Sequence, residues 1–203
     1  MNNYSLKELN NHINYLKKNV FFVNTKWPHF DILFDDLIKL SKKVKKNSNI
    51  LFLERGSLYG NLSVWAPLFQ ENNVTSIDCS TEKIKKRGSY NQKYVESSKI
   101  IRWPTSYFSD YKKIKMKKNS LDLIIIPNLL HHISDHKILF TKCFRYLKRG
   151  GTLYTFEPIL RELHQAPEDY LRFTPYGLKS LIEKEGFKIK KIKKSGGPFS
   201  AIV

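Results

Sequence analysis

The chain has 203 residues, of which 41% are apolar and 13% aromatic, which suits one α/β domain with a sizeable core and excludes wholesale disorder. No apolar run approaches the ~20 residues that span a bilayer, and the first residues have neither the apolar core nor the cleavage site of a signal peptide. We therefore expect a cytoplasmic protein whose two cysteines, Cys79 and Cys143, are buried thiols rather than a disulfide or a metal site.

The net charge is +18, and 29 of the 36 basic residues are lysines. Such a charge attracts nucleic acid or an anionic membrane surface. The excess of lysine argues against base recognition, for which arginine is better suited, and abundant Lys, Asn and Ile are also what AT-rich codons produce. A nucleic-acid partner and peripheral membrane contact are alternatives that the charge leaves open but does not favour. The sequence carries no signal of oligomeric state.

Two helical patterns come first along the chain. Residues 5–18 place apolar side chains at helical spacing behind Ser5, a suitable N-cap. A second such pattern covers residues 32–44, and the lysine-rich run that follows it ends near Asn49. We predict an N-terminal helical extension over residues 1–48 and a core domain over residues 49–203.

From Asn49 onward, apolar runs of strand length alternate with helical patterns, and this alternation predicts an α/β fold with a doubly wound, mostly parallel sheet. The expected strands are 50–53, 74–77, 99–102, 123–126, 152–156 and 187–192. The expected helices are 62–69, 81–86, 138–147 and 174–185, the last with Thr174 as cap and Pro175 in its first turn. The pattern of residues 107–115 is ambiguous, and we expect a short helix there.

Polar residues follow four of these strands. They are Glu54, Asp78, Asn128 and Glu157. Ligands of such sheets bind beyond the carboxyl ends of the strands, so we expect these side chains at a ligand site. For Asp78 the preferred role is to accept hydrogen bonds from a ribose diol, and the alternative is to cap a helix that begins near Ser80.

The loop after the first strand, Glu54-Arg55-Gly56-Ser57-Leu58-Tyr59-Gly60, resembles the acidic-x-Gly-x-Gly-x-Gly loop of class I S-adenosylmethionine-dependent methyltransferases. Leu130-His131-His132 and Leu147-Lys148-Arg149-Gly150-Gly151 match later motifs of the type 11-like group, and the resemblance covers residues 49–197. It implies a Rossmann-like fold and S-adenosyl-L-methionine as cofactor. The cofactor-binding residues that it indicates are Glu54, Gly56, Gly60, Asp78 and Asn128. Leu58 departs from the pattern, because it replaces the middle glycine with a side chain that narrows the cofactor cleft.

His131 and His132 are adjacent after a strand. In a helix such neighbours point about 100° apart, so they would not hold one ion together, and we expect no metal here. In the resembled group this run shapes the floor of the cofactor and substrate sites. The alternative is that His131 acts as a general base.

Residues 163–174 combine acidic, basic and aromatic side chains before a helix cap, as expected of a loop over an active site. The loop resembles one in a methyltransferase subgroup associated with surface polysaccharide and glycan biosynthesis. One interpretation has Asp169 and Arg172 form a local ion pair. The other has Asp169 or His164 accept a hydroxyl proton while Tyr170 and Arg172 hold an oxygen-rich substrate.

The resemblance thus implies a methyltransferase acting on a hydroxyl or carboxylate of a glycan-related or small polar acceptor. The alternatives are a basic nucleic-acid-binding protein or RNA methyltransferase on the same fold, and a degenerate domain without catalysis. Only residues 199–203 remain for a seventh strand, so we expect the antiparallel pair that completes the family's sheet to be shortened.

Overall fold

The computed structural model describes residues 4–18, 28–55, 62–80, 99–108, 110–163 and 165–194. Its central feature is a five-stranded sheet in the order β5-β3-β1-β6-β7, in which all neighbouring strands are parallel. The strands are β1 (Asn49–Glu54), β3 (Asn73–Asp78), β5 (Ser106–Tyr107), β6 (Leu121–Pro127) and β7 (Leu147–Phe156). A separate short antiparallel pair joins β2 (Leu62–Ser63) to β4 (Trp103–Pro104). The predicted mostly parallel α/β sheet is therefore confirmed.

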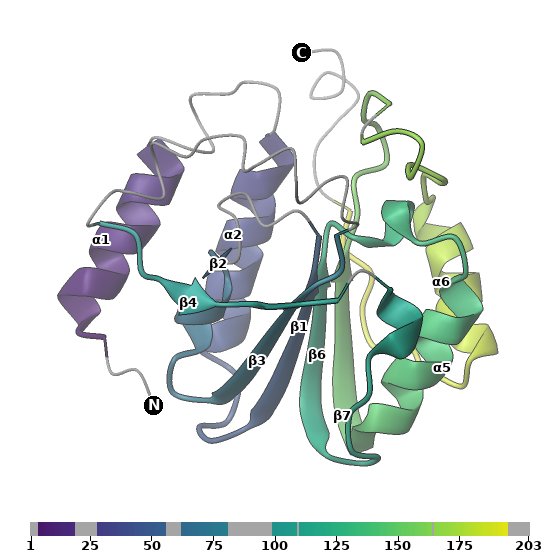
Figure 1. The fold of residues 1–203 in the computed structure, drawn as a ribbon, viewed down its shortest axis with the longest axis horizontal. Helices are drawn as coiled ribbons and strands as arrows, with labels where there is room; N and C mark the ends of the chain where they lie inside the picture. The colour runs from purple at the N-terminus through teal and green to yellow at the C-terminus, as the bar shows by residue number, and fades with distance from the viewer. Residues whose placement is uncertain are drawn as a thin grey trace.

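Helices cover both faces of the sheet (Figure 1). α1 (Leu6–Leu16) and α2 (Pro28–Ser41) lie on one side, and α5 (His136–Tyr146) and α6 (Pro175–Lys184) on the other. Alternate residues of a strand point to opposite faces, and β1 follows this rule. Its Ile50 and Phe52 belong to the apolar cluster under α1 and α2, whereas Leu51 and Leu53 belong to the cluster under α5 and α6.

The N-terminal helices are part of this packing. Ser5 and Glu8 form the reciprocal capping box that starts α1, which confirms the predicted cap. His12, on the buried face of α1, accepts a hydrogen bond from the Ile101 amide at Nδ1, 3.1 Å away, so its Nε2–H donates to the Val64 carbonyl, also at 3.1 Å. Both ring nitrogens are thus used by the neutral form, and burial lowers the pKa of His12.

The junction between α5 and β7 explains the Gly150-Gly151 pair. Gly150 has φ of 79°, a conformation that glycine adopts without steric cost. A Cβ on Gly151 would lie 2.9 Å from the Lys148 carbonyl oxygen. The pair lets the chain shift register, so that Leu121 pairs with Leu147 but Leu123 already pairs with Thr152.

Three expected elements differ from the structure. Residues 62–69 form the short strand β2 and a 3₁₀ helix, Ala66–Phe69, instead of an α-helix. The expected strand at 99–102 is absent, and its place beside β3 is taken by Ser106–Tyr107. Residues 187–192 form no strand. The expected helix at 81–86 and the final residues 195–203 lie outside the described residues.

In place of the expected short helix near 107–115, the described residues form the end of β5 at Tyr107 and a 3₁₀ turn, Tyr111–Lys113. Both cysteines are buried free thiols, as expected, and burial raises the pKa of Cys143 to about 12. Among the described helices, none combines the length and apolar character that crossing a bilayer requires.

Candidate functional site

The carboxyl ends of β1 and β3 lie side by side, because Glu54 pairs with Asp78 in the parallel register. Glu54 is buried, and its Oε1 accepts hydrogen bonds from the hydroxyls of Ser63, at 2.5 Å, and Ser76, at 2.9 Å. Burial raises the pKa of Glu54 to about 7, against the lowering effect of the two hydroxyls. This predicted cofactor-site acid is therefore held in place and poised between its charged and neutral forms near neutral pH.

Asp78 is also buried, and its Oδ1 accepts from both the amide and the hydroxyl of Ser80, at 2.8 and 2.5 Å. This local turn agrees with the capping alternative as far as the structure describes the chain, since residues 81–98 lie outside it. The turn fixes the carboxylate at the sheet edge, where a ribose-binding acid belongs. Both roles for Asp78 are compatible with this geometry.

Asn128 directly follows β6 and has φ of 58°, in the left-handed region that asparagine tolerates better than most residues. Its amide donates to the Phe156 carbonyl at 2.8 Å, which ties the end of β6 to the end of β7. Its side-chain Oδ1 is buried and has no hydrogen-bond partner among the described residues. A buried acceptor of this kind is costly unless a ligand satisfies it, which supports the predicted role of Asn128 in binding.

Glu157, just beyond β7, organises the turn after β6. Its Oε1 accepts from the amides of Leu129 and Leu130 at 2.7 and 2.5 Å, and its Oε2 lies 2.6 Å from Nδ1 of His131. The side chains of Glu157 and His131 are 2% and 0% exposed. Because an ionised carboxylate only accepts, His131 donates its Nδ1 proton to Glu157, and the lone pair of the neutral ring is on Nε2.

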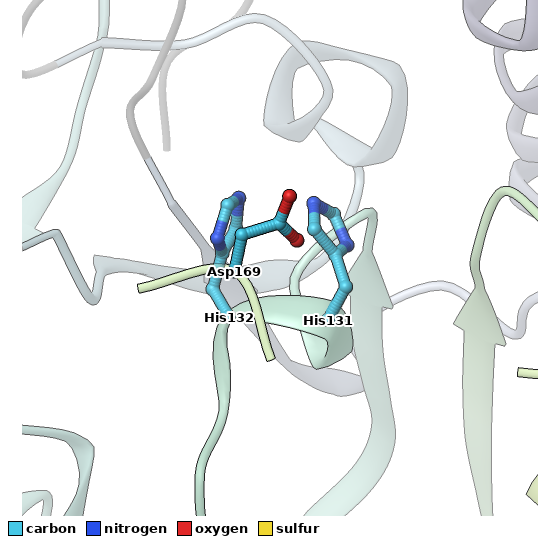
Figure 2. Close-up of side chains that lie close together, drawn as sticks. All are labelled: His131, His132 and Asp169. Atoms are coloured by element: carbon cyan, nitrogen blue, oxygen red, sulfur yellow. The ribbon is translucent and has the colours of Figure 1, made fainter. Parts of the chain in front are cut away.

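His132 is oriented in a similar way, since its Nδ1 lies 2.5 Å from the carbonyl oxygen of Glu168, which can only accept. The two histidines stand on a short 3₁₀ helix, Leu130–His132, and their ring centroids are 3.9 Å apart. The expected divergence of neighbouring side chains applies to an α-helix and is wrong for this turn. Ligand atoms of His131, His132 and Asp169 lie within 4.8 Å of one another, and Figure 2 shows the three side chains gathered together.

The loop that carries Asp169 is bound to the sheet edge at several points. The guanidinium of Arg55 contacts Gln165 at 3.0 Å and forms an ion pair with Glu168. The Tyr170 amide donates to the His131 carbonyl at 2.8 Å. The contacts of Arg55 join residues more than 100 positions apart in the chain. Together with the hydrogen bond from Tyr170 to His131, they place the expected substrate loop over the histidines.

Asp169 and Arg172 form the local ion pair that the simpler interpretation predicted. The guanidinium donates to both carboxylate oxygens, at 2.5 and 2.8 Å, and also to the Glu162 carbonyl at 3.0 Å. Arg172 is thereby engaged in shaping the loop, whereas the ring of Tyr170 is 48% exposed. The nearby Arg161, which the sequence did not indicate, is largely enclosed, and burial lowers its pKa to about 10.

Of the remaining predicted residues, Gly56, Gly60 and His164 lie outside the described part of the chain, as does Leu58. Glu54, Asp78, Asn128, His131 and Asp169 all lie at or beside the carboxyl edge of the sheet. Glu157 was expected at a ligand site, but its contact with His131 was not predicted. Its signal in the sequence is an acid directly after a strand, opposite the turn whose amides it accepts from.

Comparison with known proteins places this geometry in a family. A sequence profile described as "Methyltransferase domain" matches residues 53–155, just over half of the chain. A S-adenosylmethionine-dependent methyltransferase from Aquifex aeolicus aligns with a TM-score of 0.51 at 17% identity, over 77% of this chain and 81% of that chain. Phosphoethanolamine N-methyltransferase 2 of Haemonchus contortus, in complex with phosphomonomethylethanolamine and S-adenosylhomocysteine, aligns with a TM-score of 0.50 at 17% identity.

The second alignment covers 76% of this chain but only 37% of the Haemonchus protein. No curated protein sequence matches the chain. At such low identities the structural likeness establishes the fold alone, and the family assignment comes from the profile.

Proposed function

Because the chain belongs to the methyltransferase-domain family, we propose that it is an S-adenosyl-L-methionine-dependent methyltransferase that methylates a hydroxyl or carboxylate oxygen of a glycan-related or other small polar acceptor. The observation that carries this proposal is the Glu157–His131 pair. It supplies a buried, oriented imidazole at the sheet edge, directly beneath the loop that follows β7.

The described residues at the sheet edge fit the donor. The acids Glu54 and Asp78 end adjacent strands, and the buried Oδ1 of Asn128 is available to accept a hydrogen bond from a ligand at the same edge. When bound, S-adenosyl-L-methionine supplies a methyl group on an electrophilic sulfonium centre. The glycines Gly56 and Gly60 would allow the loop after β1 to approach this ligand closely.

His131 is the best candidate for the base. Methylation of a hydroxyl releases a proton, and a neutral imidazole with its lone pair on Nε2 can accept it. Glu157 holds the ring in the required tautomer and stabilises the imidazolium that forms. Asp169 is less suited, because Arg172 already donates to both of its oxygens. A carboxylate acceptor would need no base, so the role of His131 distinguishes the two acceptor classes.

Acceptor choice belongs to the loop 165–173. Its Tyr170 is half-exposed and is joined through its amide to the His131 carbonyl, and the Arg161 guanidinium lies close enough to interact with Asp169 and Glu157. Aromatic and cationic side chains together suit an oxygen-rich acceptor such as a sugar, which offers apolar ring faces and many hydrogen-bonding groups. The Arg55 and His131 contacts hold this loop in place before any acceptor arrives.

The test is an assay for S-adenosylhomocysteine release over a panel of sugars, nucleotide sugars and small hydroxy acids. His131→Asn is the informative variant, since the asparagine amide can still donate to Glu157 but lacks Nε2. With a hydroxyl acceptor, we expect its kcat to fall by about 10²–10⁴-fold, with little change in cofactor affinity.

His136→Gln is the matched control, because His136 is a buried histidine of the same region whose Nε2 contacts the Leu130 carbonyl at 2.8 Å. Glutamine preserves that donor, so the control should keep most of its turnover. Equal turnover of His131→Asn and wild type on a hydroxyl acceptor would rule out His131 as the base.

A further inference from the structure

We propose that His131, His132 and Asp169 form a binding site for one first-row divalent transition-metal ion, with Zn²⁺ as a representative. Two imidazoles and one carboxylate are a ligand set that Zn²⁺ and its neighbours accept well, whereas Mg²⁺ and Ca²⁺ prefer oxygen ligands only. This inference goes beyond the proposed function, because binding of an ion requires no methyl transfer.

The ligand atoms of the three residues lie close enough together to bind a single ion. One ligand atom of each residue lies within 4.8 Å of the others. Zn–ligand distances of about 2.0–2.2 Å put the ligands of a tetrahedral ion about 3.4 Å apart. Closing the site from the observed geometry therefore takes side-chain shifts on the order of 1 Å, because the three side chains are already gathered together (Figure 2).

The orientation of the rings is the second observation. Nδ1 of His131 is directed at the Glu157 carboxylate, and Nδ1 of His132 is directed at the Glu168 carbonyl. Metal-binding histidines characteristically donate their second ring nitrogen to a carboxylate or a backbone carbonyl, which fixes the tautomer and makes the ligand nitrogen more basic. Both histidines thus already have the support that an Nε2-bound ion requires.

The charged side chains around His131, His132 and Asp169 permit a cation to bind there. Arg172 engages both oxygens of Asp169, but an ionised carboxylate has about four lone-pair sites, so this contact does not exhaust it. The Glu157 carboxylate contacts His131, and the Glu168 carboxylate forms an ion pair with Arg55, so both offset the positive charge of the arginines around the loop. The side chains of His131 and Asp169 are almost fully shielded from water.

A bound ion would take the Nε2 lone pair that His131 needs as a base. The ion-bound form and the base-competent form therefore exclude one another. Metal binding is measured without any acceptor, so a result showing no bound ion would not contradict the proposed methyl transfer. In the same way, a result showing no methyl transfer would not contradict metal binding.

The experiment uses the full chain without a histidine tag, freed of metal by chelation and dialysed. Zn²⁺ content per chain is measured after equilibration, and Co²⁺ titration is followed by its visible absorption, which reports coordination by nitrogen and oxygen. We expect one ion per chain. His132→Asn, which keeps the donation to Glu168, and Asp169→Asn should each weaken binding at least about 10-fold, as loss of a ligand must exceed the 10–100-fold effect of losing a supporting residue.

His136→Gln again serves as control and should bind like wild type, since it removes a buried histidine outside the cluster. Circular dichroism establishes that each variant is folded, and His132→Asn keeps the test decisive if Asp169→Asn fails to fold. The proposal would be overturned if wild type bound no more Zn²⁺ per chain than His132→Asn does. It would also be overturned if the His136→Gln control were the variant that alone lost binding.

Discussion

Replacing Glu54 with glutamine should change how the stability of the protein depends on pH. Glu54 is buried, and its Oε1 accepts from Ser63 and Ser76. The amides of Trp65 and Ala66 donate to the Ser63 hydroxyl oxygen, so that hydroxyl donates its own proton to Glu54. A glutamine reproduces the neutral acid, because its oxygen can accept both hydroxyls.

The magnitude follows from the pKa of Glu54, which burial raises from 4.5 to about 7. The folded state therefore holds a proton on Glu54 that the unfolded chain releases, so this contribution to stability is present at low pH and is lost as pH rises through 7. At about 1.4 kcal/mol per pKa unit, the full loss is about 3–4 kcal/mol. Most of it, about 2–3 kcal/mol, falls between pH 5 and pH 8.

Urea unfolding of wild type and Glu54→Gln at pH 5, 6, 7 and 8 measures this effect as a difference. Groups common to both proteins cancel, including His12, whose lowered pKa makes stability rise with pH. We expect glutamine to gain about 2–3 kcal/mol relative to wild type across that range. Glu71→Gln, at an exposed surface ion pair with Lys46, should show no such trend.

Two curves that stay parallel within about 0.5 kcal/mol would refute the reasoning, because they would mean that Glu54 is ionised in the folded protein throughout.

The other predictions concern ligands. Asp78→Ala should weaken S-adenosyl-L-methionine binding by about 1–3 kcal/mol in calorimetry, the scale for lost charge-assisted hydrogen bonds, and unchanged affinity would exclude ribose recognition. Asp169→Asn should lower turnover while cofactor affinity stays within about threefold, or ~0.7 kcal/mol, since we propose that the loop 165–173 binds the acceptor and not the cofactor. Full activity of that variant would move acceptor recognition elsewhere.

The strands that the sequence predicted best are those with the strongest local signals. The run Leu123–Ile126 is buried on both faces and lies within β6, and Thr174 with Pro175 starts α6 where expected. Such elements depend on side chains close together in the chain, so a single sequence is enough to identify them.

The predictions from the sequence were wrong where contacts between residues far apart in the chain decide the structure. The apolar residues of 62–69 resemble a helix, but Pro67 and the hydrogen bond from Ser63 to Glu54 shape a strand and a 3₁₀ turn instead. The expected strand at 187–192 would need an antiparallel neighbour, and within the described residues it has none.

In the candidate site, too, the sequence identified individual residues but not the contacts between distant ones. Acids after strands could be named from the sequence, whereas the Glu157–His131 contact depends on the register of β6 against β7. The approach of Asp169 to the two histidines depends on the long-range contacts of Arg55 with the loop. No local pattern specifies such contacts.

Calorimetric titration of the folded chain with S-adenosyl-L-methionine tests the central claim most directly, because every role assigned to Glu54, Asp78 and Asn128 assumes that this ligand binds at the sheet edge. We predict saturable binding with one site per chain, weakened in Asp78→Ala. A folded protein that gives no binding heat up to about 1 mM ligand, a free energy of association weaker than about −4 kcal/mol, would contradict the account and indicate a methyltransferase-like domain that has lost its cofactor.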